Sequence, residues 1–210
     1  KGDLHSLQYG SEYGDGYLRL ALAEFLSNAY EIAVDPEPIF ITNGNSQALD
    51  LVCTIFAKPG ETLFVEEPSY FLALDIFRNH HLKIVGIPVD AQGLSIEALE
   101  EALKTHRPAF LYTIPAFQNP TGFTLSVERR QRLVELSQQH SFLIVADEVY
   151  QLLNYTVTPP KPMAAYVDSG TVLSLGTFSK ILAPGLRLGW IQAAQPLINR
   201  LASTGYVISG

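Results

Sequence analysis

Residues 142–147 read Phe-Leu-Ile-Val-Ala-Asp, an unbroken apolar run that ends on a carboxylate. A short apolar run without alternating polar residues is typical of a strand buried on both faces, as in a parallel sheet covered by helices. The run predicts a strand over 142–146, with Asp147 at its carboxyl end. A carboxylate buried at the end of such a strand needs a cationic partner.

Similar runs recur along the chain and alternate with stretches of helical period. Six further strands are expected at residues 39–42, 62–65, 83–88, 109–114, 172–175 and 188–192. Helices are expected at residues 17–30, 46–56, 70–79, 96–104 and 127–140. Ser95 and Ser126 precede the last two helices at N-cap positions. The alternation predicts an α/β fold of three layers, in which helices cover both faces of a mostly parallel, seven-stranded sheet.

The composition favours a globular protein that works on small molecules. Of its 210 residues, 47% are hydrophobic and 17% are charged, which is enough to bury a sizeable core. A net charge of −7 without any basic run argues against nucleic-acid binding. No apolar stretch is as long as a membrane span, which needs about 18 residues, and the N-terminal residues show no signal-peptide pattern. The single cysteine, Cys53, cannot form an internal disulfide, so we expect a reducing cytoplasm.

The sequence Gly-Thr-Phe-Ser-Lys at residues 176–180 carries the most specific chemical signal, with Arg187 two helical turns further on. A lysine amine attacks an aldehyde only when it is neutral, and burial lowers its pKa, so we expect Lys180 to be buried. Thr177 and Ser179 offer hydroxyl donors to a phosphate, and Arg187 offers a planar guanidinium whose N–H groups can bind two phosphate oxygens. The pattern indicates a Schiff-base site beside a phosphate. The competing interpretation is a solvated surface lysine with a structural arginine.

Other polar side chains fall at the carboxyl ends of predicted strands, where open α/β sheets bind ligands. Asp147 could pair with the protonated nitrogen of a pyridine ring, and Tyr150 could point its hydroxyl into the same site. Asn119 presents its amide from an Asn-Pro turn after the strand at 109–114. The competing interpretations are an acidic helix start at Asp147 and Glu148, and an ordinary turn at Asn119.

A second candidate for phosphate binding follows the predicted strand at 39–42. Gly44 lets the backbone approach an anion closely, and Asn45 and Ser46 lie where a helix begins and its N–H groups are free. The competing interpretation is a simple N-cap at Asn45 or Ser46, which is compatible with phosphate binding. Tyr70 follows another strand and could stack on a flat ring, although such a residue is more often a packing residue.

Taken together, these motifs resemble the large domain of pyridoxal-phosphate-dependent aminotransferases of fold type I, in the class I/II group. The matching segments are residues 45–47, 70, 119–122, 147–150, 177–180 and 185–187. They run in the family's order over nearly the whole chain. Residues 176–190 most resemble the branch that contains 2-aminoadipate and aromatic aminotransferases. The same sequence pattern occurs in the aminotransferase-like domain of MocR-type transcription regulators.

The resemblance implies a role for each matching residue around pyridoxal 5'-phosphate. Lys180 would bind the cofactor aldehyde as a Schiff base and later move the proton between substrate and cofactor. Asp147 would hold the pyridinium nitrogen, Asn119 and Tyr150 the phenolic oxygen, and Tyr70 would stack on the ring. Of these, Lys180, Asp147 and Tyr70 form the expected catalytic set, and no metal is expected.

The resemblance also implies a phosphate site and a partner subunit. The phosphate would be held by Thr177, Ser179, Arg187 and the amides of Asn45 and Ser46. Tyr9 resembles a family tyrosine that reaches the phosphate of the neighbouring subunit, which implies a homodimer with shared sites.

The implied activity is transfer of an amino group from an amino acid to a 2-oxo acid by a ping-pong Schiff-base mechanism. Residues 1–210 would form the cofactor-binding large domain, with the small domain and the N-terminal segment of the family outside the chain. Two alternatives share the fold, namely a cofactor-binding domain of a MocR-type regulator and a pyridoxal-phosphate-dependent lyase or decarboxylase. Neither a Gly-x-Ser-x-Gly elbow nor a Walker loop is present.

Overall fold

The computed structural model describes the backbone of residues 11–209 and the side chains of residues 11–203. Its centre is one sheet with the strand order β1-β8-β7-β6-β5-β2-β3-β4. The strands are β1 (Ile39–Thr42), β2 (Thr62–Glu67), β3 (Lys83–Asp90), β4 (Gly93–Leu94), β5 (Pro108–Thr113), β6 (Leu143–Asp147), β7 (Val172–Thr177) and β8 (Gly189–Ala193). Strands β2, β3, β5, β6 and β7 are parallel, whereas β8 runs antiparallel to both β1 and β7.

All seven predicted strands are present, with ends that differ from the prediction by at most two residues. The count of seven was wrong by one, because β4 adds an eighth strand at the edge of the sheet. This strand has only two residues, too few for an alternating pattern to be recognised in the sequence.

Helices cover both faces of the sheet, as predicted. The α-helices are α1 (Gly16–Tyr30), α2 (Asn45–Phe56), α3 (Phe71–Asn79), α4 (Ile96–Thr105), α5 (Val127–His140) and α6 (Gln195–Ser209). Two 3-10 helices, η2 (Met163–Ser169) and η3 (Pro184–Leu186), complete the set among the described residues. Ser95 and Ser126 cap α4 and α5, because their hydroxyl oxygens accept from the N–H groups of Ala98 and Arg129. No helix in the described part of the chain is long and apolar enough to cross a membrane.

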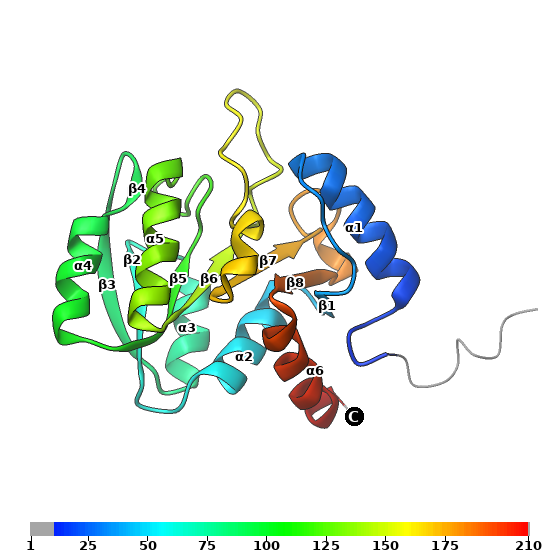
Figure 1. Ribbon diagram of the computed structural model, residues 1–210, viewed down its shortest axis with the longest axis horizontal. Coiled ribbons are helices and arrows are strands. Elements are labelled where there is room, and N and C mark those ends of the chain that lie inside the picture. The colour runs from blue at the N-terminus through cyan, green and yellow to red at the C-terminus, as the bar shows by residue number, and fades with distance from the viewer. Residues whose placement is uncertain (1–10, 210) are drawn as a thin grey trace, which may run out of the picture.

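Alternating side chains of the central strands divide the core into two layers. On β2, Leu63 and Val65 pack with helices α2, α3 and α6, whereas Phe64 packs with α4, α5 and η2 on the opposite face. Helix α1 packs separately against Ile39 of β1 and Trp190 of β8. Figure 1 shows α4 and α5 side by side at one end of the sheet and α1 at the other. The predicted three-layer α/β/α architecture is therefore confirmed.

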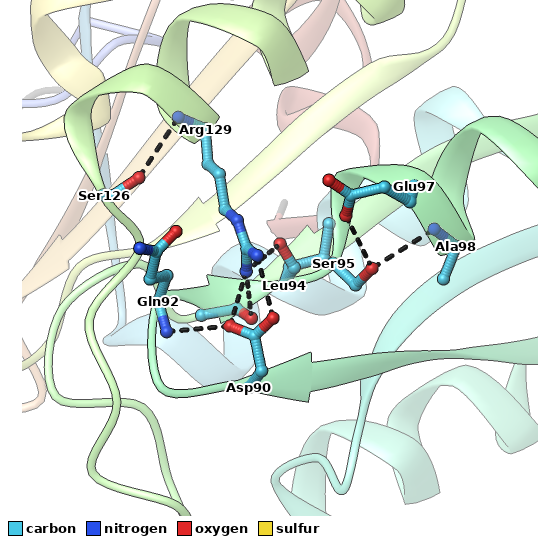
Figure 2. A network of polar contacts seen from close by, with 9 residues as sticks. Asp90, Gln92, Leu94, Ser95, Glu97, Ala98, Ser126 and Arg129 are labelled. Carbon is cyan, nitrogen blue, oxygen red and sulfur yellow. Dashed lines mark hydrogen bonds and ion pairs between the residues drawn. The ribbon is translucent and has the colours of Figure 1, made fainter.

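Arg129 of α5 fixes the outer end of the sheet (Figure 2). Its guanidinium forms two contacts of 2.7 and 2.8 Å with the carboxylate of Asp90, at the end of β3. One of its nitrogens also donates to the carbonyl oxygens of Gly93 and Leu94, at 2.9 and 3.1 Å. A single side chain therefore holds the β3–β4 turn against the helix layer.

Candidate active site

The predicted site residues meet at the carboxyl edge of the sheet. Because β8 is antiparallel to its neighbours, its first residue, Gly189, lies opposite the last residues of β1 and β7, Thr42 and Thr177. A cavity of about 190 Å³ opens at this edge. Nine predicted site residues line it, namely Asn45, Ser46, Tyr70, Asp147, Tyr150, Thr177, Ser179, Lys180 and Arg187.

The remaining two predicted site residues are Asn119 and Tyr9. Asn119 does not line the cavity, but its amide nitrogen donates to the hydroxyl of Tyr150 at 3.3 Å. It precedes Pro120 across a cis peptide bond. Tyr9 lies outside the described residues. Tyr70 is the N-cap residue of α3 and lines the cavity.

Asp147 is the buried carboxylate of the site, with 3% of its surface exposed. Its Oδ1 accepts from the Asn45 amide nitrogen at 2.5 Å, and its Oδ2 accepts from the Tyr112 hydroxyl at 2.8 Å. Burial raises the pKa of Asp147 to about 6, while the two hydrogen bonds and the charge of Lys180 act in the opposite direction. The carboxylate therefore faces a cation in the cavity without forming an ion pair with it.

Helix α2 begins beside the cavity without a side-chain cap. Its N-cap is Gly44 with φ of +79°, so the interpretation of Asn45 or Ser46 as the N-cap was wrong. The Asn45 amide nitrogen instead reaches Asp147, and the buried Asn45 Oδ1 has no hydrogen-bond partner. A Cβ at Gly44 would lie 2.9 Å from Nη2 of Arg187. A helix start, a glycine and a guanidinium therefore converge, an arrangement suited to an anion.

Lys180 lies in the loop after β7 and is exposed, so the expectation that it is buried was wrong. Every residue of β7 is buried, but the chain leaves the sheet after Thr177 and carries Lys180 into the open cavity. Thr177 accepts from the backbone N–H of Ser179 at 3.1 Å and lies 3.0 Å from the carbonyl oxygen of Leu188. These contacts fix the turn that presents Lys180.

Sequence reasoning missed three buried residues next to the site. Tyr112 falls inside the predicted strand at 109–114, and Glu66 directly follows the predicted strand at 62–65. Glu66 accepts from the Thr113 hydroxyl at 2.5 Å and from the Ile114 N–H at 3.1 Å. Burial raises the pKa of Glu66 to about 7.

The third missed residue is Gln118, which joins the loop that carries Asn119 to the segment before Tyr70. Its amide nitrogen donates to the Pro68 carbonyl at 2.8 Å, and its side-chain oxygen accepts from Thr121. Its neighbours in the chain are the apolar Phe117 and the polar Asn119, so the local sequence does not indicate that Gln118 is buried.

The interpretation of Asp147 and Glu148 as a helix start was wrong. No helix begins there, and Glu148 turns away from the cavity into the opposite core layer. Its carboxylate accepts from the backbone N–H groups of Met163 and Ala164 at 2.6 and 3.2 Å, and from the Ser174 hydroxyl. Glu148 therefore anchors η2, and only Asp147 of the pair faces the site.

The chain is similar to known proteins over nearly its whole length. The family model of aminotransferases of class I and II matches residues 5–206. Aromatic-amino-acid aminotransferase 1 of Thermococcus litoralis is 44% identical over 201 residues, which cover 93% of this chain and 48% of that protein. An uncharacterized HTH-type transcriptional regulator of Bacillus subtilis, YisV, is 36% identical over 98% of this chain and 43% of its own length.

A solved structure shares the fold of this chain. The kynurenine aminotransferase of Pyrococcus horikoshii, crystallised in complex with PMP, superposes with a TM-score of 0.88 at 38% identity. The superposition covers 97% of this chain and 51% of that one. The chain spans about half the length of the curated relatives it matches.

Proposed function

We propose a function for this chain from its family, since it belongs to the aminotransferases of class I and II. We infer that it binds pyridoxal 5'-phosphate and serves the transfer of an amino group from an amino acid to a 2-oxo acid. The observation that carries this proposal is the cavity at the carboxyl edge, where Lys180, the buried Asp147 and the uncapped start of α2 converge.

The residues of the cavity fit this cofactor. A phosphate needs N–H and cationic donors, and the start of α2 lies beside Arg187, with Gly44 leaving space between them. A pyridine nitrogen needs a buried acceptor, and Asp147 is one. The unpartnered Oδ1 of Asn45 leaves a buried acceptor available at the same place. When bound, pyridoxal 5'-phosphate supplies an electron-withdrawing ring that stabilises the negative charge left when a carbon beside it loses a proton.

The residues of this chain would divide the work as follows. Lys180 would hold the cofactor aldehyde through its Nζ, and the same amine would carry the proton between the substrate carbon and the cofactor. Asp147 would accept from the ring nitrogen and keep it protonated. Tyr150, oriented by Asn119, would hold the phenolic oxygen, and Tyr70 would cover one face of the ring.

The phosphate would be held by Thr177, Ser179, Arg187 and the backbone amides of Asn45 and Ser46. Tyr9 would reach the phosphate of a second subunit, so the working form would be a homodimer with shared sites. We further propose that residues 1–210 are the large, cofactor-binding domain, and that the protein acts in the cytoplasm on small amino and 2-oxo acids. The net charge of −7 and the single cysteine support this setting.

A second function, a cofactor-binding regulatory domain of the MocR type, is favoured by the similarity to the Bacillus subtilis regulator. Both functions need the same cofactor site, so they differ in whether amino-group transfer follows binding. A lyase or decarboxylase on the same scaffold would release a different product from the amino acid, which product analysis separates.

The experiment that tests the cofactor site is addition of pyridoxal 5'-phosphate to the purified chain and to K180A. We expect a visible absorption band in the wild type, fixed by borohydride on the peptide that contains Lys180, and no band in K180A. The matched control is K83A, which removes an exposed lysine of β3 outside the cavity and should keep the band. Labelling scattered over surface lysines would contradict the proposal.

A further inference from the structure

We propose that Asn45 and Tyr112 are positioning residues that together clamp the Asp147 carboxylate, each holding one of its oxygens. The inference rests on the proposed function, in which Asp147 receives the cofactor ring. It gives the Asn45 side chain a task distinct from phosphate binding, which falls to the backbone amide of the same residue. It also gives Tyr112, which does not line the cavity, a part in the site.

The first half of the clamp is rigid because Tyr112 is fixed along its whole length. The residue lies on β5 and has no exposed surface. Its ring packs edge-on against Phe77 of α3, with ring centroids 5.3 Å apart. The hydroxyl at its tip then lies 2.8 Å from Asp147 Oδ2. A tyrosine needed only to fill the core would not require a polar tip at a buried carboxylate.

The second half of the clamp comes from a different element. Asn45 is the first residue of α2, and its amide nitrogen lies 2.5 Å from Asp147 Oδ1. The two donors thus approach the carboxylate from α2 and β5, and a carboxyl group bound through both oxygens cannot rotate about its bond to Cβ. A carboxylate has about four acceptor positions, so two donors leave room for a third from a ligand.

Neutral donors are what the surroundings of Asp147 require. Three further titratable groups act on this carboxyl or feel its charge, namely Lys180, Glu66 and Tyr70. Lys180 is exposed, and under the proposed function its amine holds the cofactor aldehyde and carries the proton, so its charge changes during the reaction. Glu66 is a second buried acid, and the charge of Asp147 contributes to raising the pKa of Glu66. The hydrogen bonds from Asn45 and Tyr112 are therefore the stabilisation that stays constant whatever happens at Lys180.

The clamp is tested first without cofactor, by following the Asp147 carboxyl resonance against pH in the ¹³C-aspartate-labelled chain. The wild-type midpoint is expected at about 6. In Y112F and in N45A, we expect a midpoint about 1 pH unit higher, because each variant loses a donor to the charged form. The double variant should titrate higher than either. Y112F keeps the ring, and N45A places a good helix former in α2.

The matched control is Y30F, which removes another buried tyrosine hydroxyl, one that feels the charge of Glu148 rather than Asp147. Its Asp147 midpoint should equal that of the wild type. If folded Y112F and N45A also titrate like the wild type, the clamp is wrong. Should Y112F not fold, N45A alone decides, since an unchanged midpoint there removes half of the clamp.

A second measurement separates this inference from the proposed function. The affinity for pyridoxal 5'-phosphate is measured between pH 5 and 8 by absorbance. In both single variants, the pH at which affinity is half-maximal should rise by the same amount as the carboxyl midpoint. Absence of a band on Lys180 in the wild type would contradict the proposed function, whereas a band with unshifted pH dependence in the variants would contradict the clamp alone.

Discussion

Gly176 of β7 lies so close to Trp190 of β8 that an added Cβ would come within 2.2 Å of the indole ring. The two residues are paired in the sheet, and the indole is buried, with 2% of its surface exposed. Trp190 also packs against Phe178, at 5.1 Å between ring centroids. The indole therefore occupies the space beside the point where β7 ends and the loop that carries Lys180 begins.

This packing predicts that G176A destabilises the protein by about 1–3 kcal/mol, the usual cost of forcing extra atoms into a filled core. Urea unfolding followed by tryptophan fluorescence measures the change. The control is G16A, since a Cβ at Gly16 meets no atom within 4 Å. Equal stability of G176A and the wild type would mean that the indole moves aside.

Arg187 is predicted to account for much of the phosphate affinity. R187A should weaken binding of pyridoxal 5'-phosphate by about ten- to a hundredfold, because hydrogen bonds to charged groups contribute about 1.5–3 kcal/mol each. R187K should recover only part of the loss, since an ammonium lacks the planar fork. Dissociation constants from absorbance titration test this. R78A, which removes an exposed arginine of α3 outside the cavity, should bind like the wild type.

Glu66 is predicted to make stability fall as pH rises. Burial lifts its pKa from 4.5 to about 7, so the folded state holds a proton that the unfolded state releases within this window. The wild type should lose stability relative to E66Q between pH 4.5 and 7, by a total on the order of 3 kcal/mol. Urea unfolding at several pH values gives the difference. E67Q, at the exposed neighbouring position, keeps Glu66, so its stability should fall over this pH window by the same amount as that of the wild type.

Arg129 is predicted to matter more than Arg132, although both belong to α5. R129A removes the side-chain donor to the carbonyl oxygens of Gly93 and Leu94, which should cost about 1–3 kcal/mol. Arg132 forms ion pairs with half-exposed carboxylates, so R132A should cost less than about 1 kcal/mol. Chemical denaturation of the two variants ranks them, and the reverse order would refute this assignment.

The strands and most helices could be predicted because the spacing of apolar residues along the sequence indicates which face of an element is buried. Helix α6 was missed although its signals were present, with Pro196 near its start and apolar residues at 197, 198, 201 and 202. The placement of site residues at strand ends also followed from the sequence, since the carboxyl ends of parallel strands share an edge.

Partners distant in the sequence could not be predicted. The period of β5 indicates that Tyr112 is buried, but not that its hydroxyl meets a carboxylate 35 residues further on. Burial of Lys180 was expected because its strand is apolar, yet the strand ends three residues earlier and the turn that follows is open. Both depend on the sheet order, which local sequence does not determine.

The position of β1 at one end of the sheet affects when the site can form during synthesis. Among residues 11–209 its one strand neighbour is β8, and Ile39 pairs with Gln192, about 150 residues later in the chain. A nascent chain that has not yet reached Gly189 thus has no strand on which β1 can align. The start of α2 follows β1 directly, so its final position beside Arg187 depends on the same pairing. During synthesis on the ribosome, the proposed phosphate site at the start of α2 is therefore expected to be among the last parts of the domain to assemble.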